Sequence, residues 1–190
     1  IITGEASVLS HGGTFYVYMN NWGGCADVDC CSTSAGCASC CYSVNRTDPC
    51  IYTDNHTVVV YKTDLSTWEY LGVALALPDR IAGIMFRPHV VYNAKTAKFV
   101  MWYMNRHPGQ KGYAIATADS PAGPYKEVVN STEMHGHGRH DNSGDFQILV
   151  DDDGAAYHVR DNFVIERLAD DYLSGTGEIG TFKPPRERDG

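Results

Sequence analysis

The chain has 190 residues, of which 43% are hydrophobic, enough to bury a core as one domain or as part of a larger one. Its formal charge of −8 disfavours binding to a phosphate backbone, and no basic stripe offsets that charge. No apolar stretch reaches the roughly 18 to 20 residues that cross a bilayer, so we expect neither a nucleic-acid nor a membrane partner.

The first predicted element is a hairpin over residues 5–19, EASVLSHGGTFYVYM. An aliphatic strand runs to a Gly-Gly turn and returns through an aromatic-rich strand.

A cysteine-rich stretch interrupts the pattern after this hairpin. All seven cysteines lie within it: Cys25, Cys30, Cys31, Cys37, Cys40, Cys41 and Cys50. Their spacing does not give two clean C-x2-C knuckles, so disulfide bonds are favoured over a zinc cluster, although an odd number leaves one thiol without an internal partner. Three sequons, at Asn45, Asn55 and Asn130, also favour an oxidising, extracellular setting.

Two later segments repeat the hairpin, FRPHVVYNAKTAKFVMWYM at 86–104 and GDFQILVDDDGAAYHV at 144–159. A third strand-like run follows each hairpin, at 57–64, 112–119 and 162–170, and a fourth follows in the first two units, at 67–75 and 123–130. The tail 177–190 is a candidate for the fourth strand of the third unit. Recurring units of four short antiparallel strands are typical of propeller blades.

We therefore predict an all-β fold, a β-propeller of four-stranded antiparallel blades with about three blades present. Blade one is expected at about 1–80 with the cysteine-rich insertion at 23–50, blade two at about 83–132 and blade three at about 140–190. A ring closes with at least about four blades, so we expect an incomplete propeller whose uncovered strand edges associate.

The first strand of each blade lines the axis of a propeller, so the residues that begin these strands converge. Here they are Glu5, Arg87 and Asp145, two carboxylates and a guanidinium. Hydrolysis of a glycosidic bond uses such a set, because one carboxylate activates water, another protonates the leaving oxygen, and cations and hydrogen bonds set their pKa values. The alternative is that Glu5 belongs to a frayed terminus and Asp145 only caps a strand.

The hairpin patterns together with ATADSPAGPY and LADDYLSG resemble glycoside hydrolase family 43, most closely its exo-β-1,3-galactanase-like branch. The resemblance implies a five-bladed propeller and an inverting mechanism, with a general base on blade one, an acid-tuning carboxylate on blade three and a general acid on blade four. By position, Glu5 stands where many members carry the base Asp, and Asp145 matches the acid-tuning residue. The general acid would then lie beyond Gly190, and Phe86 stands where some galactanase-like members carry Glu.

Four further side chains are candidates for substrate binding. Trp22 and Phe86 flank strand ends where a ring can stack on a sugar, although such aromatics also pack in cores. Arg87 and His89 share one strand; Arg87 would orient a carboxylate or a sugar hydroxyl, or else satisfy strand-end carbonyls.

Metal binding is not predicted. The run HGHGRH at 135–140 is read as a loop covering the site, and DDDG at 151–154 as a hairpin turn rather than a calcium loop. No cofactor is expected, and a central calcium is not readable from the sequence.

The sequence thus predicts a secreted glycoside hydrolase that acts by inversion on galactose-, arabinose- or xylose-containing polysaccharides. A non-catalytic, secreted carbohydrate-binding propeller is the alternative, and a purely structural secreted domain is a third reading.

Overall fold

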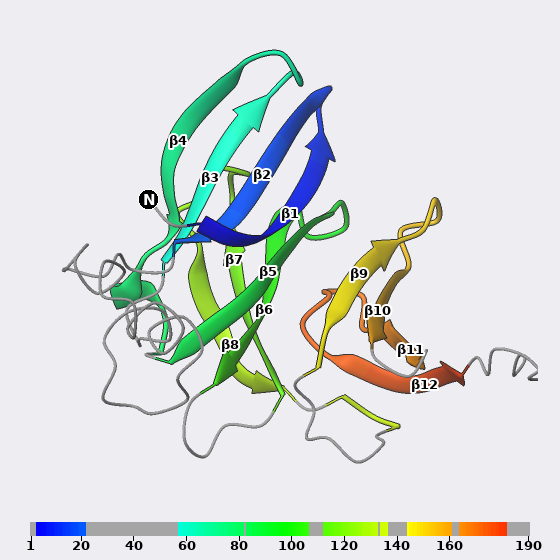
Figure 1. Ribbon diagram of the computed structural model, residues 1–190. Coiled ribbons are helices and arrows are strands. Elements are labelled where there is room, and N and C mark those ends of the chain that lie inside the picture. The colour runs from blue at the N-terminus through cyan, green and yellow to red at the C-terminus, as the bar shows by residue number, and fades with distance from the viewer. Residues whose placement is uncertain are drawn as a thin grey trace, which may run out of the picture.

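The computed structural model describes residues 3–21, 57–81, 83–106, 112–132, 134–136, 144–160 and 164–181. These residues form three four-stranded antiparallel sheets, each with its strands in chain order (Figure 1). The predicted fold is confirmed, because each sheet is one blade of a partial β-propeller. The cysteine-rich insertion, Trp22 and the sequons at Asn45 and Asn55 lie outside the described residues.

Blade one consists of β1 (Thr3–His11), β2 (Thr14–Asn21), β3 (Thr57–Thr63) and β4 (Trp68–Leu75). A short 3-10 helix, Leu77–Asp79, leads to blade two. Blade two consists of β5 (Ile84–Asn93), β6 (Lys98–Arg106), β7 (Tyr113–Ala118) and β8 (Lys126–Thr132). Blade three consists of β9 (Phe146–Val150), β10 (Ala156–Arg160), β11 (Val164–Leu168) and β12 (Gly175–Thr181). Among the described residues, no helix has the length and apolar character needed to cross a membrane.

The hairpin turns form where the sequence predicts them. Gly12 and Gly13 have φ angles of 57° and 76°, as the two central residues of a type I′ turn require. In the DDDG turn, the amide of Gly154 donates to Asp151 O at 2.9 Å, and the amide of Asp151 donates to Ala155 O at 2.8 Å.

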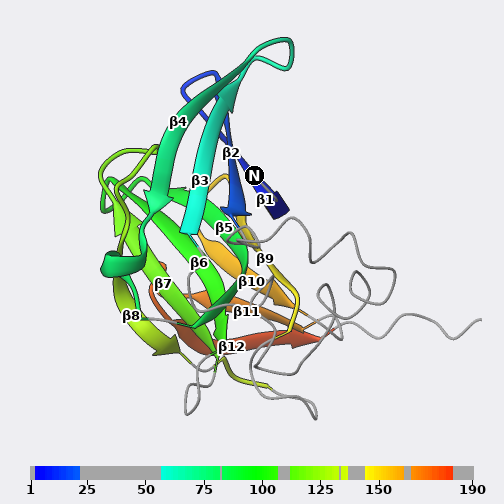
Figure 2. The same cartoon turned by 60° about the vertical axis from the view of Figure 1, so that its left-hand side comes forward.

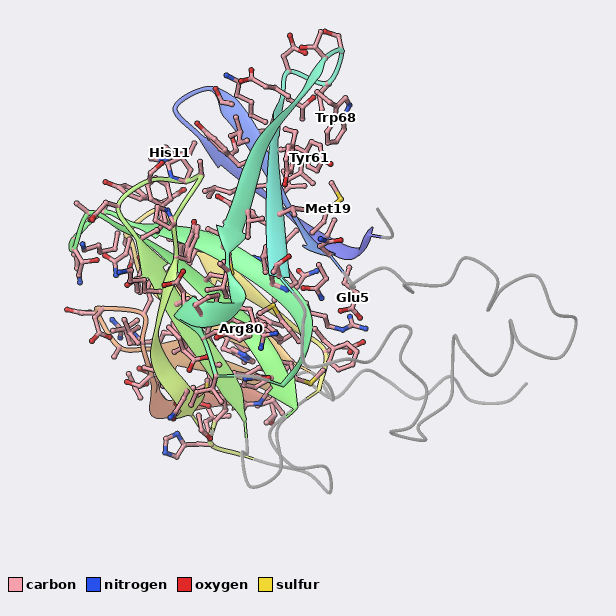
Figure 3. The ribbon with its side chains drawn as sticks, turned by 90° about the vertical axis from the view of Figure 1, so that its left-hand side faces the viewer. Glu5, His11, Met19, Tyr61, Trp68 and Arg80 are labelled. Atoms are coloured by element: carbon pink, nitrogen blue, oxygen red, sulfur yellow. The ribbon has the colours of Figure 1, made fainter. Side chains whose placement is uncertain are left out.

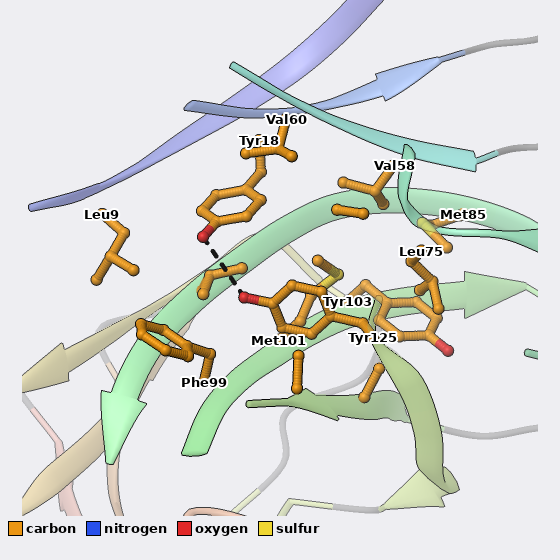
Figure 4. Close-up of a cluster of buried hydrophobic side chains, with 14 of the residues drawn as sticks. Leu9, Tyr18, Val58, Val60, Leu75, Met85, Phe99, Met101, Tyr103 and Tyr125 are labelled. Carbon is orange, nitrogen blue, oxygen red and sulfur yellow. Dashed lines mark hydrogen bonds between the residues drawn. The ribbon is translucent and has the colours of Figure 1, made fainter. Parts of the chain in front are cut away.

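Blade two is buried on both faces because its strands alternate between two cores. Along β6, Met101 and Tyr103 face blade one, whereas Val100 and Trp102 face blade three. The first core contains Leu9, Tyr18, Val58, Val60, Leu75, Met85, Phe99, Met101, Tyr103 and Tyr125 (Figure 4). The second lies between blades two and three and contains Val100, Trp102, Tyr113, Ile115, Phe146, Ile148 and Leu168.

Packing of the blades places their first strands side by side. β1 lies next to β5, and β5 lies next to β9 (Figures 1 and 2). The N-terminal ends of these three strands therefore lie on one side of the molecule.

One face of blade one is turned away from blade two. Figure 3 shows Tyr61 and Trp68 on the opposite side of the blade from His11, whose ring packs against Tyr92 of blade two. Trp68 and Tyr70 on this outer face are 58% and 50% exposed. We call the exposed side chains of Val8, Trp68, Tyr70 and Val73 the outer face of blade one.

Candidate functional site

Three residues at the leading ends of the first strands form the candidate site. Glu5 is the extra residue of a β-bulge in β1, between Gly4 and Ala6. Arg87 lies in a second bulge, between Phe86 and His89 of β5. Asp145 comes directly before β9. Bulges of this kind often re-aim side chains next to functional sites.

The backbone at the two bulges is unusual. Glu5 and Arg87 have φ angles of 49° and 54°, in the left-handed region that favours glycine. Non-glycine residues held there carry strain that surrounding contacts must offset, and such strain concentrates at functional sites.

The side chains of Glu5, Arg87 and Asp145 meet. Arg87 Nε lies 2.9 Å from Asp145 Oδ1 and 3.7 Å from Glu5 Oε1. The backbone amide of Arg87 also donates a 2.8 Å hydrogen bond to Glu5 Oε2. The guanidinium of Arg87 thus joins Glu5, 82 positions earlier in the chain, to Asp145, 58 positions later.

Burial differs between the two carboxylates. The Glu5 side chain is 23% exposed, that of Arg87 40% and that of Asp145 61%. Asn20 supports the more buried carboxylate, since its Nδ2 donates to Glu5 Oε2 at 3.4 Å and to Met85 O at 3.2 Å. One oxygen of Glu5 is therefore anchored by two donors, while the other makes the looser contact with the guanidinium.

The ion pairs by themselves hold this arrangement weakly. Pairs with this degree of exposure contribute about 0–1 kcal/mol each, because water and salt screen them. Buried contacts must therefore set the position of the leading ends.

Behind Asp145, one such contact comes from blade two. The Tyr113 hydroxyl donates a 3.0 Å hydrogen bond to Gly144 O, and the Tyr113 ring meets the Phe146 ring at a centroid distance of 4.8 Å. His158 stacks on Phe146, with the two ring centroids 4.9 Å apart and the ring planes inclined by 8°. Burial, aided by the charge of Arg160 and by His89, lowers the pKa of His158 to about 3.

Three residues that support the site, Asn20, Tyr113 and His158, were not predicted from the sequence. Tyr113 and His158 stand at strand positions where alternation predicts burial, but alternation does not reveal contacts with another blade. Asn20 is the last but one residue of an apolar strand, where a polar side chain at a position that alternation predicts to be buried is a signal in the sequence.

The predicted substrate-binding residues are placed differently from the charged trio. Phe86 is partly buried and packs against the second core. His89 is half-buried with its ring 6.4 Å from that of Phe146, and burial lowers its pKa despite a hydrogen bond with the Ile148 backbone. Both lie at the interface between blades two and three, so a packing role accounts for much of their surface, and their contact with substrate stays a prediction, as does that of Trp22.

Within the described ranges, no group of three or more His, Cys, Asp or Glu residues is arranged to hold a metal ion. His135 Nδ1 lies 2.7 Å from Glu166 Oε1, and His137 and His140 fall outside the described residues. In the DDDG turn, Asp151 and Asp153 accept hydrogen bonds from the turn's own amides.

Comparisons with known proteins bear on this arrangement. No protein-family model matches the chain. No curated protein matches it either. Among solved structures, the chain is similar to a family 43 β-1,3-galactosidase solved with galactodeoxynojirimycin, with a TM-score of 0.68 and 27% identity over 94% of this chain and 61% of that one.

Two exo-β-1,3-galactanases give further matches. The enzyme from Phanerochaete chrysosporium, solved with galactose, has a TM-score of 0.62 and 25% identity over 95% of this chain and 39% of that one. The enzyme from Clostridium thermocellum has a TM-score of 0.60 and 25% identity over 90% of this chain and 35% of that one. The chain therefore spans about three fifths of the first of these structures and less of the other two.

The fold is that of a glycosidase-like propeller. The resemblance to glycoside hydrolase family 43 predicted from the sequence is confirmed by these structures. The three solved structures described above are named as a β-1,3-galactosidase and two exo-β-1,3-galactanases.

Proposed function

We propose that the protein hydrolyses glycosidic bonds in galactose-containing polysaccharides, with inversion at the anomeric carbon. The observation that carries the proposal is the convergence of Glu5, Arg87 and Asp145 at one end of three blades. The 27% identity to a β-1,3-galactosidase supports galactose as the first sugar to test, ahead of arabinose and xylose.

Each charged residue has a role that its contacts suit. Glu5 acts as general base: Oε2 is anchored by the Arg87 amide, and Oε1 accepts the proton of the attacking water. The water oxygen bonds to the anomeric carbon, the bond from that carbon to the leaving oxygen breaks, and a general acid protonates the leaving oxygen. Asp145 orients and electrostatically biases that acid, and Arg87 fixes the two carboxylates relative to each other. No residue of the chain 1–190 is proposed as that acid.

A non-catalytic carbohydrate-binding propeller is the second candidate. It is favoured by Glu5 in place of the more usual Asp, and by the hydrogen bond that already occupies Glu5 Oε2. In that case Arg87 and Asp145 would bind sugar hydroxyls without bond cleavage.

Substitution of Asp145 by Asn in the protein as it occurs naturally tests the first candidate. We expect the kcat on β-1,3-linked galactose oligosaccharides to fall by about 10²–10⁴, the contribution typical of acid–base catalysis, while folding is retained because the side chain is 61% exposed. Asp170→Asn is the matched control, since Asp170 is 79% exposed and pairs with Lys95 at 3.0 Å away from the site.

The results separate the candidates. Equal activity of both variants and the wild type would refute the proposal. A wild type that binds the oligosaccharides without cleaving them would establish the binding propeller instead.

We also propose that the protein is extracellular, with disulfides in its cysteine-rich insertion. The sequon that begins at Asn130 lies in β8, and the Asn130 side chain is exposed. Expression through a eukaryotic secretory pathway should attach a glycan there. Mass spectrometry of the wild type and of Asn130→Gln, each before and after endoglycosidase treatment, should show one glycan fewer on the variant; equal masses of attached glycan would contradict glycosylation at this site.

A further inference from the structure

A single buried tyrosine contacts the residues on both sides of Asp145. Tyr113 begins β7 of blade two and is 1% exposed. Its hydroxyl donates to Gly144 O at 3.0 Å, and its ring meets that of Phe146 edge-on at a centroid distance of 4.8 Å. The residue before Asp145 and the residue after it are therefore both held from the neighbouring blade.

We propose that Tyr113 is a positioning residue for Asp145, an inference that rests on the proposed function. Tyr113 touches no substrate in this role. It fixes the main chain at residues 144–146, and the Asp145 carboxylate is then directed by Arg87.

The two contacts that hold Asp145 differ in their exposure to solvent. The ion pair between Arg87 and Asp145 joins side chains that are 40% and 61% exposed, so solvent and salt weaken it and both side chains can leave it. The hydrogen bond from Tyr113 is made by a side chain that is almost completely shielded from water. Such a bond keeps its geometry when the surface pair opens.

The Tyr113 ring is itself immobilised by aromatic neighbours. Its centroid lies 4.6 Å from that of His158 and 6.2 Å from that of Trp102. Trp102 is tied in turn to blade three, because its Nε1 donates to Tyr172 O at 2.9 Å. Since a close-packed interior resists displacement, the hydroxyl of Tyr113 defines a fixed point for the leading end of β9.

Removal of the hydroxyl isolates this contact. Tyr113→Phe keeps the ring and its packing but leaves Gly144 O without this donor. The main chain at Asp145 then samples more positions, and a carboxylate that acts by orienting another group loses effect. We expect kcat to fall about tenfold with KM little changed, and the pH profile of kcat to shift, because small misplacements of catalytic groups cost rate rather than binding.

Tyr18→Phe is the matched control. Tyr18 lies in the first core, where Figure 4 shows its hydroxyl next to that of Tyr125, and it is 0% exposed. Its hydroxyl donates to Pro121 O at 2.7 Å, from blade one to the segment between β7 and β8 of blade two. It loses a buried tyrosine-to-carbonyl bond between blades, as Tyr113→Phe does, but far from Asp145 in the chain and in a different core. Its kcat and its pH profile should match those of the wild type.

Two further measurements make the test decisive. In an Asp145→Asn background, Tyr113→Phe should have no additional effect on kcat, because a positioning residue acts only through the residue it positions. Hydrogen–deuterium exchange of the peptide covering residues 144–147 should rise in Tyr113→Phe and not in Tyr18→Phe.

The outcomes distinguish this inference from the proposed function. If Asp145→Asn abolishes activity while Tyr113→Phe behaves like Tyr18→Phe, the inference is overturned and the proposed function stands. If Asp145→Asn has no effect, the proposed function fails, and hydrogen–deuterium exchange then tests whether Tyr113 fixes the main chain at Asp145. Unchanged exchange at 144–147 in Tyr113→Phe overturns the inference, and increased exchange supports it.

Discussion

The backbone amide of Arg87 donates a 2.8 Å hydrogen bond to Glu5 Oε2, so the bulge in β5 of blade two binds the carboxylate carried by the bulge in β1 of blade one. Both residues adopt left-handed backbone conformations. This conformation turns the Arg87 amide and side chain toward the same neighbouring carboxylate. The two strained, non-glycine positions are therefore the ones whose contact joins blades one and two at the site.

Replacement of Arg87 by Gly or by Ala separates the side chain from the backbone. Both variants lose the guanidinium, so both should lose activity to a similar extent. The φ of 54° suits Gly better than Ala, and we expect Arg87→Gly to unfold with a free energy about 1 kcal/mol higher than Arg87→Ala. Urea unfolding monitored by Trp fluorescence measures the difference. Equal stabilities would show that the bulge stores no strain.

Glu166 provides a second prediction, on stability alone. Its carboxylate is fully buried and accepts hydrogen bonds from His135 N at 2.8 Å, His135 Nδ1 at 2.7 Å, Arg160 Nη1 at 3.1 Å and Gly177 N at 3.1 Å. Burial acts to raise the pKa of Glu166, but the hydrogen bonds from His135, Arg160 and Gly177 outweigh it, so the pKa is lowered. The carboxylate ties β11 to β12 and to the segment at 134–136.

Glu166→Gln should reduce the free energy of unfolding by about 3 kcal/mol, because the buried guanidinium of Arg160 loses its counter-charge. Because the pKa is lowered on folding, this group stabilises the fold above its ordinary value of 4.5, and that stability is lost as the pH falls through the folded pKa. Glu178→Gln, in a surface pair with Arg167 whose side chains are 71% and 45% exposed, should change stability by less than about 0.5 kcal/mol. Similar losses in the two variants, measured by urea unfolding at pH 7, would contradict the structural role of Glu166.

The sequence predicted the blades because local rules determine them. Alternating apolar residues and Gly or Asp turns define each hairpin, and their repetition defines the propeller. Convergence of Glu5, Arg87 and Asp145 then follows from the axial position of first strands. The bulges were not predictable, since neither Glu5 nor Arg87 is a glycine that would mark a left-handed position.

Contacts between blades also escaped prediction, because they join residues that are distant in the chain. The pattern VIERL indicates a strand, but the burial of Glu166 depends on His135, which lies 31 residues away. Phe86 illustrates the reverse problem, because an aromatic residue near a strand end is equally compatible with stacking on a sugar and with packing in a core. Only the structure shows that it packs against the second core.

The outer face of blade one predicts association of the chain 1–190. Its contiguous apolar side chains, among them Trp68 at 58% and Tyr70 at 50% exposed, resemble a surface that another sheet covers. We expect the wild-type chain to self-associate at micromolar concentration and Trp68→Lys to shift it toward the monomer in analytical ultracentrifugation. Val128→Lys, at a 52% exposed position on β8 of blade two, should leave the association unchanged. A monomeric wild type would contradict the prediction.

His158 should make the fold sensitive to acid well above the range in which carboxylates titrate. The side chain is 0% exposed, and neither ring nitrogen has a hydrogen-bond partner among the described residues. Burial lowers its pKa from 6.5 to about 3, so in the range between these values the unfolded chain takes up a proton that the folded chain does not. Stability that is present above pH 6.5 is therefore lost as the pH falls.

His158→Phe removes this dependence while keeping an aromatic ring against Phe146. From the size of the shift, wild-type stability should fall by on the order of 2 kcal/mol between pH 7.5 and pH 5 because of this group. His89 adds to the fall in both proteins, because burial lowers its pKa as well. Urea unfolding at the two pH values should thus show a smaller loss in the variant than in the wild type, and at pH 7.5, where the imidazole is neutral in both states, the two proteins differ only by packing. Parallel losses would contradict this prediction, because they would mean that His158 binds its proton equally well in the folded and the unfolded chain.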